Sequence, residues 1–209
     1  MYLNPITQEN IAKLKKCGVH FLGPGVGDLS CGDEGIGRMV DLDLICKKIQ
    51  SMFLSQLSLK SKKILISCGG TKEKIDNVRI LTNLSSGKLG NELANLASFM
   101  GAEVGVVSTV PLDENPHVTD VVYVEDAAEM KKVLEEKIED YQCLYMAAAV
   151  SDFTCKAVSS KIKRADACNL ELVVTEDILG TLGKSKGDKT FIGFCLEDDD
   201  LEKVALEKM

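Results

Sequence analysis

The chain has 209 residues, which is enough for one sizeable domain and an appendage. Its hydrophobic fraction of 45% with only 5% aromatic residues suits an aliphatic α/β core, whereas its formal charge of −7 argues against nucleic acid as the main partner. No apolar run approaches the roughly 20 residues needed to span a bilayer, and the amino terminus lacks a signal-peptide pattern, so we expect a cytoplasmic protein without a membrane partner.

Residues 1–58 differ in character from the rest of the chain. Helical spacing of apolar residues predicts helices over 7–16 and 41–57, and a short apolar run predicts a strand over 17–22. The glycine-rich cluster at 23–27 is interpreted as a loop, because no amphipathic helix comes after it. A polar linker then leads to the second part of the chain.

From residue 63 to residue 209, predicted strands and helices alternate. Strands are predicted over 63–68, 103–108, 121–124, 143–150, 170–174 and 190–194, and helices over 86–100, 126–140 and 177–184. Such alternation predicts an α/β domain in which a Rossmann-like, mostly parallel sheet carries helices on both faces, with the first 58 residues as an appendage. Because ligands of these folds bind beyond the carboxyl ends of the strands, we expect three loops to converge there: 69–88, 150–164 and the segment after Phe194.

The stretch 76–88 lies between a predicted strand and a predicted helix and carries the chemistry of an anion site. The helix is expected to start near Ser86, where unpaired backbone N–H groups at the positive end of the helix dipole favour an anion. The guanidinium of Arg79 can donate two hydrogen bonds to one phosphate or carboxylate, and the side chain of Asn83 has both a hydrogen-bond donor and an acceptor. In an equally compatible interpretation, Ser85 and Ser86 only cap the helix and Arg79 is solvated.

This stretch matches neither standard nucleotide fingerprint. Ser86-Gly87-Lys88 lacks the upstream glycine of a Walker P-loop and is followed by Leu89. The predicted strand over 103–108 ends without the carboxylate that a dinucleotide-binding fold uses to hold the ribose. A dinucleotide-dependent reductase is therefore disfavoured.

The strand predicted over 143–150 ends in three successive alanines and is followed by Asp152. Small side chains allow a flat ligand to approach the backbone, and the Asp152 carboxylate can accept hydrogen bonds from a ribose or a base. The alternative is close helix packing against the strand, with Asp152 as an N-terminal cap. Three cations lie further on at 161–164, either as a solvated face or as side chains that close over a triphosphate.

Cysteine and histidine are distributed poorly for metal sites or histidine-based catalysis. The eight cysteines form no Cys-x-x-Cys pair, which disfavours a zinc site or a disulfide framework. The two histidines, His20 and His117, lie far apart in sequence, which disfavours a histidine-based catalytic triad. The sequence identifies no metal ligand.

Taken together, these motifs resemble phosphopantothenoylcysteine synthetase over residues 63–209. They occur in the order and approximate spacing of that family: Gly69-Gly70-Thr71, Asp76-x-Val78-Arg79-x-x-x-Asn83-x-Ser85-Ser86-Gly87-Lys88-x-Gly90, Ala147-Ala148-Ala149-Val150-x-Asp152, Lys161-Ile162-Lys163, Thr175-x-Asp177-Ile178-Leu179 and Gly193-Phe194-x-x-Glu197. Residues 1 to about 50 resemble the end of phosphopantothenoylcysteine decarboxylase, through Met1-Tyr2, Thr7-Gln8-x-Asn10 and Cys31-Gly32-Asp33-x-Gly35-x-Gly37-Arg38-Met39. The chain thus resembles the middle of the bifunctional bacterial coenzyme A flavoprotein.

The resemblance implies a ligase that uses CTP and Mg²⁺ to activate the carboxylate of 4′-phosphopantothenate as an acyl cytidylate, from which the amine of L-cysteine displaces CMP. It implies catalytic roles for Asn83, which would hold the acyl cytidylate, and for Lys161, a loop lysine over the reacting phosphate. The implied substrate-binding residues are Arg79, Gly70, Thr71, Ser85, Ser86 and Gly87. The implied nucleotide-binding residues are Ala148, Ala149, Asp152, Lys161, Asp177, Ile178, Leu179, Phe194 and Lys208.

The chain also departs from the resembled family. It stops at Met209, before a second lysine, further strands and a dimer-forming region, so the implied homodimer concerns the longer family members. Cys31 matches the proton donor of the decarboxylase, but FMN belongs to a complete decarboxylase domain and we expect no decarboxylase activity from this chain alone. We interpret the chain as a fragment of a longer protein or a degenerate product. The alternative function is a non-catalytic subunit that binds a nucleotide or a partner.

Overall fold

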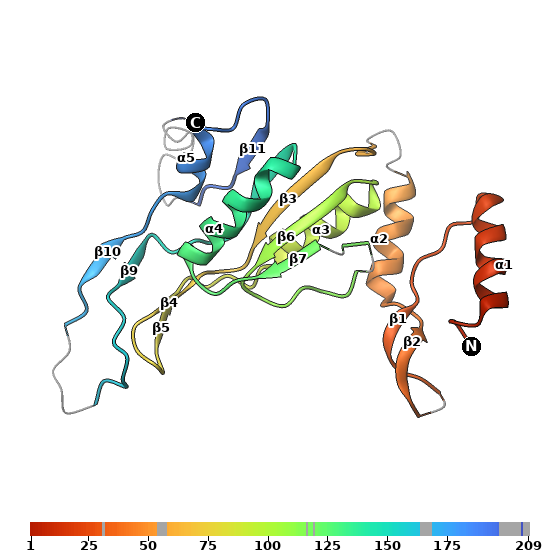
Figure 1. Ribbon diagram of the computed structural model, residues 1–209, viewed down its shortest axis with the longest axis horizontal. Coiled ribbons are helices and arrows are strands. Elements are labelled where there is room, and N and C mark those ends of the chain that lie inside the picture. Colours follow the sequence, from red (N-terminus) through yellow and green to blue (C-terminus); the bar gives the residue numbers. More distant parts are fainter. Residues whose placement is uncertain are drawn as a thin grey trace.

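Five parallel strands form the central sheet of the computed structural model, which describes residues 1–30, 32–53, 58–115, 117–118, 120–163, 169–196 and 206. The strands are β3 (Lys63–Cys68), β6 (Glu103–Ser108), β7 (Asp120–Tyr123), β8 (Cys143–Met146) and β11 (Thr190–Gly193). Their order is β11-β8-β3-β6-β7, and every neighbouring pair is parallel. The predicted α/β class with a Rossmann-like sheet is confirmed (Figure 1).

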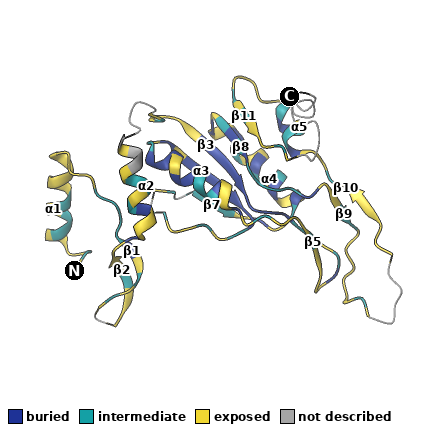
Figure 2. Cartoon of the chain, turned by 180° about the vertical axis from the view of Figure 1, so that it is seen from behind, coloured by how far each residue is buried: buried dark blue, intermediate teal, exposed yellow. Residues whose placement is uncertain are grey.

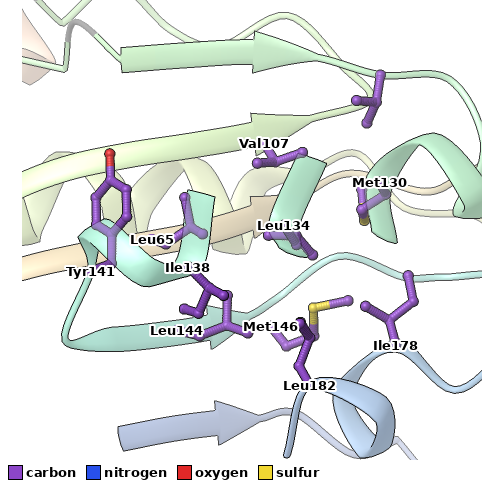
Figure 3. Close-up of a cluster of buried hydrophobic side chains, with 11 residues drawn as sticks. Leu65, Val107, Met130, Leu134, Ile138, Tyr141, Leu144, Met146, Ile178 and Leu182 are labelled. Carbon is purple, nitrogen blue, oxygen red and sulfur yellow. The ribbon is translucent and has the colours of Figure 1, made fainter. Parts of the chain in front are cut away.

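Helices cover both faces of the sheet, because successive side chains of a strand point to opposite faces. On one face, Ile64 and Ile66 belong to a buried cluster with Ala94 and Ala97 of helix α3 (Lys88–Phe99). The other face packs against helices α4 (Ala127–Lys137) and α5 (Ile178–Gly183), as Figure 3 shows. This second cluster includes Leu65, Val107, Met130, Leu134, Leu144, Met146, Ile178 and Leu182. Full burial of each large aliphatic side chain contributes roughly 1.5–3 kcal/mol to folding.

The strand predicted over 143–150 and the helix predicted over 126–140 both end earlier in the structure. Strand β8 ends at Met146, so residues 147–150 continue beyond the sheet instead of extending it. The helix predicted over 126–140 ends at Lys137 and continues as a single 3₁₀ turn, η1 (Ile138–Asp140).

Two antiparallel ribbons lie outside the central sheet. The strand predicted over 170–174 is β10 (Leu172–Val174), which pairs with β9 (Phe153–Cys155), an element that the sequence patterns do not predict. Its assignment to the parallel sheet is wrong, because all three residues of β10 are exposed, whereas a parallel strand is covered on both faces. The second ribbon pairs β4 (Lys72–Lys74) with β5 (Ile80–Thr82). The stretch 76–88 therefore includes a strand before helix α3 begins.

The N-terminal part consists of α1 (Pro5–Lys16), β1 (Gly25–Asp28), β2 (Glu34–Arg38) and α2 (Leu42–Phe53). The strand predicted over 17–22 is wrong. Gly18, with φ of +85°, closes helix α1, and residues 19–24 pair with no strand in the described part of the chain.

The loop predicted at 23–27 is wrong for residues 25–27, because they belong to β1, which pairs antiparallel with β2. Gly27 and Gly37 both have φ of +152°, a backbone conformation that is open to glycine. The glycines that suggest a loop from composition are thus the residues that allow these two segments to pair.

The N-terminal part contacts the rest of the chain mainly through α2. Val40 and Leu44 bury with Phe99 of α3, and Lys47 Nζ lies 2.7 Å from Glu92 Oε2. Helix α1 has no buried residue, and it lies at the opposite end of the molecule from the β9–β10 ribbon (Figures 1 and 2). The accessible surface is 14292 Å², compared with roughly 9,500 Å² for a compact monomer of this mass. The chain is therefore elongated. No helix of the described residues has the length and apolar character needed to cross a membrane.

Candidate functional site

The loops that follow β3 and β8 meet at the carboxyl edge of the sheet. These strands are neighbours, but the chain leaves β3 toward β6 on one side, and β11 lies on the other side of β8. This point, where the strand order reverses, is where open α/β sheets hold their ligands. Gly70 and Ala149 form an isolated parallel bridge there, and Ala149 N donates to Gly69 O at 2.8 Å. The loops that follow β3 and β8, two of the three that we expect to converge, therefore do so.

Asn83 joins the same edge through its side-chain amide. Its Nδ2 donates to Val150 O at 3.1 Å and to Ala149 O at 3.4 Å, while the residue itself remains exposed. A Cβ atom on Gly70 would lie 3.0 Å from Asn83 O, so glycine allows this close approach. Thr71 Oγ1 accepts a hydrogen bond from Ser151 N at 2.9 Å. The structure thus brings Gly70, Thr71, Asn83 and Ala149 together.

Helix α3 begins beside this edge, two residues later than predicted. Its N-cap is Gly87, with φ of +75°, which has no side chain of its own to accept a hydrogen bond from the helix. Ser86 Oγ accepts from Lys88 N only at a long 3.4 Å. The interpretation in which Ser85 and Ser86 mainly cap the helix is therefore weak, and the first N–H groups of the helix suit an anion.

Arg79 lies next to the turn of the β4–β5 hairpin and contacts the loop at 150–164. Its Nη1 forms an ion pair with the Asp76 carboxylate, and both Nη1 and Nη2 donate to Ile162 O at 3.3 Å. The interpretation of Arg79 as simply solvated is wrong. These contacts occupy three of the five N–H donors of a guanidinium, so the described contacts leave donors for a ligand. Four residues of extended chain, about 13 Å, separate Arg79 from Asn83.

Asp152 and Lys161 lie in the loop at 150–164. The alternative in which Asp152 caps a helix is wrong, because strand β9 follows it, and its backbone oxygen accepts from Thr175 N at 2.9 Å. Lys161 is exposed, next to Ile162. Ala148 N donates to Ser67 Oγ at 3.0 Å, which fixes the alanine segment to strand β3.

The predicted nucleotide residues around α5 differ in how much side chain they present. Asp177 is the N-cap of α5 and accepts from Gly180 N at 2.9 Å, whereas Ile178 is buried in the core and offers only its backbone to a ligand. Leu179 is half-buried against the core, and Phe194 is 50% exposed. Cys31 and Lys208 lie outside the described residues.

Among the residues that the structure describes, His, Cys, Asp and Glu side chains form no group of three or more that could hold a metal ion. A magnesium ion bound with a nucleotide usually keeps several waters and takes one or two carboxylates in addition to phosphate oxygens. Exposed single carboxylates such as Asp152 and Asp177 fit that requirement.

Sequence reasoning misses the contribution of Asp76. The Asp76 side chain is fully buried, and its Oδ1 accepts from Val78 N at 2.7 Å and Arg79 N at 2.8 Å. An aspartate followed by such backbone contacts is a common turn motif, so the spacing of Asp76 and Arg79 contained the signal. Its third partner, Ile162, lies 86 residues away in sequence and is found only in the structure.

The fold is that of a Rossmann-like α/β protein, with a candidate ligand site where its strand order reverses. The family model described as DNA/pantothenate metabolism flavoprotein C-terminal domain matches residues 59–209, and a model described as Flavoprotein matches residues 1–54. The first match covers more than half of the chain, so the chain belongs to the DNA/pantothenate metabolism flavoprotein C-terminal domain family.

Three relatives show how far the similarity extends. The coenzyme A biosynthesis bifunctional protein CoaBC of Bacillus subtilis (strain 168) is 36% identical over 100% of this chain and 53% of its own length. A cysteine/cysteine sulfinic acid decarboxylase from an unknown prokaryotic organism is 39% identical over 96% of this chain and 58% of its own length. The crystal structure of the C-terminal domain of a CoaBC protein shares 39% identity and a TM-score of 0.63 over 72% of each chain. The chain thus spans little more than half the length of the curated relatives it matches.

Proposed function

We propose that this chain carries the phosphopantothenate–cysteine ligase activity of coenzyme A biosynthesis. The observation that carries the proposal is the meeting of Asn83, Gly70 and Ala149 beside the N-terminus of helix α3. The similarity to CoaBC proteins along the whole chain supports it. In the proposed division of the chain, residues 63–209 form the ligase domain and residues 1–58 derive from a flavoprotein domain.

The proposed reaction has two steps. A carboxylate oxygen of 4′-phosphopantothenate attacks the α-phosphorus of CTP and displaces pyrophosphate, which gives an acyl cytidylate. The amine of L-cysteine then attacks the acyl carbon, expels CMP and loses a proton. Activation is needed because a free carboxylate is a poor acyl donor. The protein contributes mainly by positioning the reactants and offsetting their negative charge.

The geometry suits an elongated substrate with an anion at each end. In the proposal, the N–H groups after Gly87, together with Ser85 and Ser86, bind the phosphate of 4′-phosphopantothenate, and Arg79 adds positive charge. The Asn83 amide, fixed on Ala149 and Val150, holds the acyl cytidylate. Lys161 neutralises the reacting phosphate.

The cytidine would occupy the segment that follows β8 together with the start of α5. Ala148 and Ala149 leave room for a flat base, and Asp152 offers a carboxylate to the ribose. Asp177, Leu179 and Phe194 would complete the pocket, with Ile178 contributing its backbone and Lys208 reaching the triphosphate. Mg²⁺ bound with the nucleotide would offset the charge of the triphosphate during transfer.

The remaining proposals concern a longer protein that has the same domains as the curated relatives. FMN would bind only in a complete decarboxylase domain, where Cys31 would donate a proton. In that longer protein, a homodimer would form through the ligase domain, and the protein would be located in the cytoplasm. The alternative function, a non-catalytic subunit, would bind CTP without turning it over.

We expect the phosphate of the substrate to contribute strongly to binding. Isothermal titration should give an affinity for 4′-phosphopantothenate at least about 10-fold higher than for pantothenate, because charge-assisted hydrogen bonds to the helix N-terminus are lost with the phosphate. L-Cysteine alone serves as the control ligand and should not reproduce this difference. Equal affinities for the two pantothenate compounds would contradict the proposed phosphate site.

A further inference from the structure

Four hydrogen-bonded contacts join the turn at 75–79 to the loop at 158–162. Val158 N donates to Ile75 O at 2.9 Å, and Asn77 Nδ2 donates to Ser159 O at 2.6 Å. Ile162 N donates to Asp76 Oδ2 at 3.1 Å, and the Arg79 guanidinium donates to Ile162 O at 3.3 Å. We call this set of contacts the turn–loop latch. It ties two segments that are about 80 residues apart in sequence.

Asp76 is the centre of the turn–loop latch. Its buried carboxylate accepts from three backbone N–H groups and from the Arg79 side chain. Burial alone would raise the pKa of Asp76, but these hydrogen bonds outweigh that effect and lower its pKa from the ordinary 3.8 to about 2. The carboxylate is therefore ionised at any neutral assay pH and fully engaged by its partners.

The side chain of Ile162 is partly covered by the protein. It is half-buried and lines a cavity of about 170 Å³ together with Ile75, Cys155 and Val158. Its backbone N–H and C=O are both held by the latch. The backbone on either side of Ile162 carries Lys161 and Lys163, which are exposed. Because Ile162 is held in place, the Cα positions of these two lysines are held as well, although their side chains extend into solvent.

We propose that Asp76 is a positioning residue of the ligase site, which joins the Arg79 turn to the Lys161 loop so that the two cations act as one unit. This inference rests on the proposed function. Arg79 and Lys161 come from separate loops, and without a common partner each would have to be ordered by the substrate itself. A displacement of about 1 Å in a positioning group can cost about 100-fold in rate. The latch removes that freedom before the substrate binds.

Asp76→Asn tests the latch with little change in shape. The side-chain oxygen of asparagine can still accept from Val78 N and Arg79 N, but its NH₂ group cannot accept from Ile162 N or pair with the guanidinium. We expect amide hydrogen exchange of Ile162 in the ligand-free chain to become at least about 10-fold faster, read by mass spectrometry of peptides over 158–163. Asp126→Asn is the matched control, since Asp126 also accepts a backbone N–H, from Glu129, at the start of α4.

The kinetic test is a double-mutant cycle with Lys161→Gln. We expect Asp76→Asn alone to lower kcat/KM for CTP by about 30-fold, but to cost less than about 3-fold in the Lys161→Gln background, because the latch acts through Lys161. Asn77→Ala, a change at an exposed position, removes the contact to Ser159 and should give a smaller loss in the same direction. It keeps the test decisive if Asp76→Asn does not fold.

The outcomes separate the latch from the proposed function. Unchanged exchange at Ile162 would show that the latch does not hold the loop and would overturn the inference. Faster exchange with wild-type kinetics, or fully additive losses in the cycle, would overturn the positioning role. A folded wild type that makes no product while its Ile162 exchange still depends on Asp76 would overturn the proposed function, and with it the catalytic role of the latch.

Discussion

Asn83→Asp should reduce amide formation at least about 100-fold while the fold remains intact. Asn83 Nδ2 donates to Val150 O and Ala149 O, and a carboxylate in its place would face the same two carbonyl oxygens without a proton to donate. The side chain would move away from the edge where β3 and β8 end, and its negative charge would repel the phosphate of the acyl cytidylate. A displacement of about 1 Å in a group that positions the substrate can cost about 100-fold in rate. The measurement is the rate of 4′-phosphopantothenoylcysteine formation by mass spectrometry.

The stability of this variant should be close to that of the wild type, because Asn83 is exposed. Asn4→Asp provides a matched control for the same chemical change. Asn4 caps helix α1 through a hydrogen bond from Ile6 N at 2.9 Å, and aspartate caps helices equally well. Product formation by Asn83→Asp within about 3-fold of the wild-type rate would remove Asn83 from the proposed site.

Gly87→Ala should lower the free energy of unfolding by about 2–4 kcal/mol. Gly87 has φ of +75°, which a residue with a Cβ atom rarely adopts, and that Cβ would lie 2.5 Å from Val110 Cγ2 and 3.0 Å from Cys68 Sγ. Backbone strain and overpacking therefore act together at the first turn of α3. Urea unfolding followed by circular dichroism measures the effect as a lower midpoint with an unchanged slope.

Gly183→Ala is the control for this prediction. Gly183 ends helix α5, and a Cβ atom there would meet nothing within 4 Å. Alanine also has the higher helix propensity, so this variant should be neutral or more stable by about 0.5–1 kcal/mol. Equal unfolding midpoints for the two variants would mean that α3 does not begin in the strained conformation at Gly87.

The regular part of the fold could be predicted from sequence because each of its elements has a local signal. Strands β3 and β6 have the predicted bounds, since their uninterrupted apolar runs suit strands buried on both faces. The three-residue strands β4, β5 and β9 are too short to produce a pattern. In β10, the apolar run resembles that of a core strand, but only its pairing with β9 shows that it lies outside the sheet.

The site was predictable to the extent that its residues lie close together in sequence. Asn83, Ser86 and Gly87 lie within a few residues of one another, so their chemistry is visible in the motif. The ion pair between Arg79 and Asp76 is also local, but the contact of both with Ile162 depends on how two distant loops pack. Ile178 matches the family motif, but its burial among core residues is set by the packing of α5 on the sheet.

The most direct test of the central claim is CMP release from CTP in the presence of 4′-phosphopantothenate and Mg²⁺, with and without L-cysteine. We expect CMP release that continues only when L-cysteine is added, in step with the formation of 4′-phosphopantothenoylcysteine. ATP in parallel shows whether the pocket prefers cytidine. A folded chain that binds CTP but releases no CMP with all substrates present would contradict the claim and favour the non-catalytic subunit.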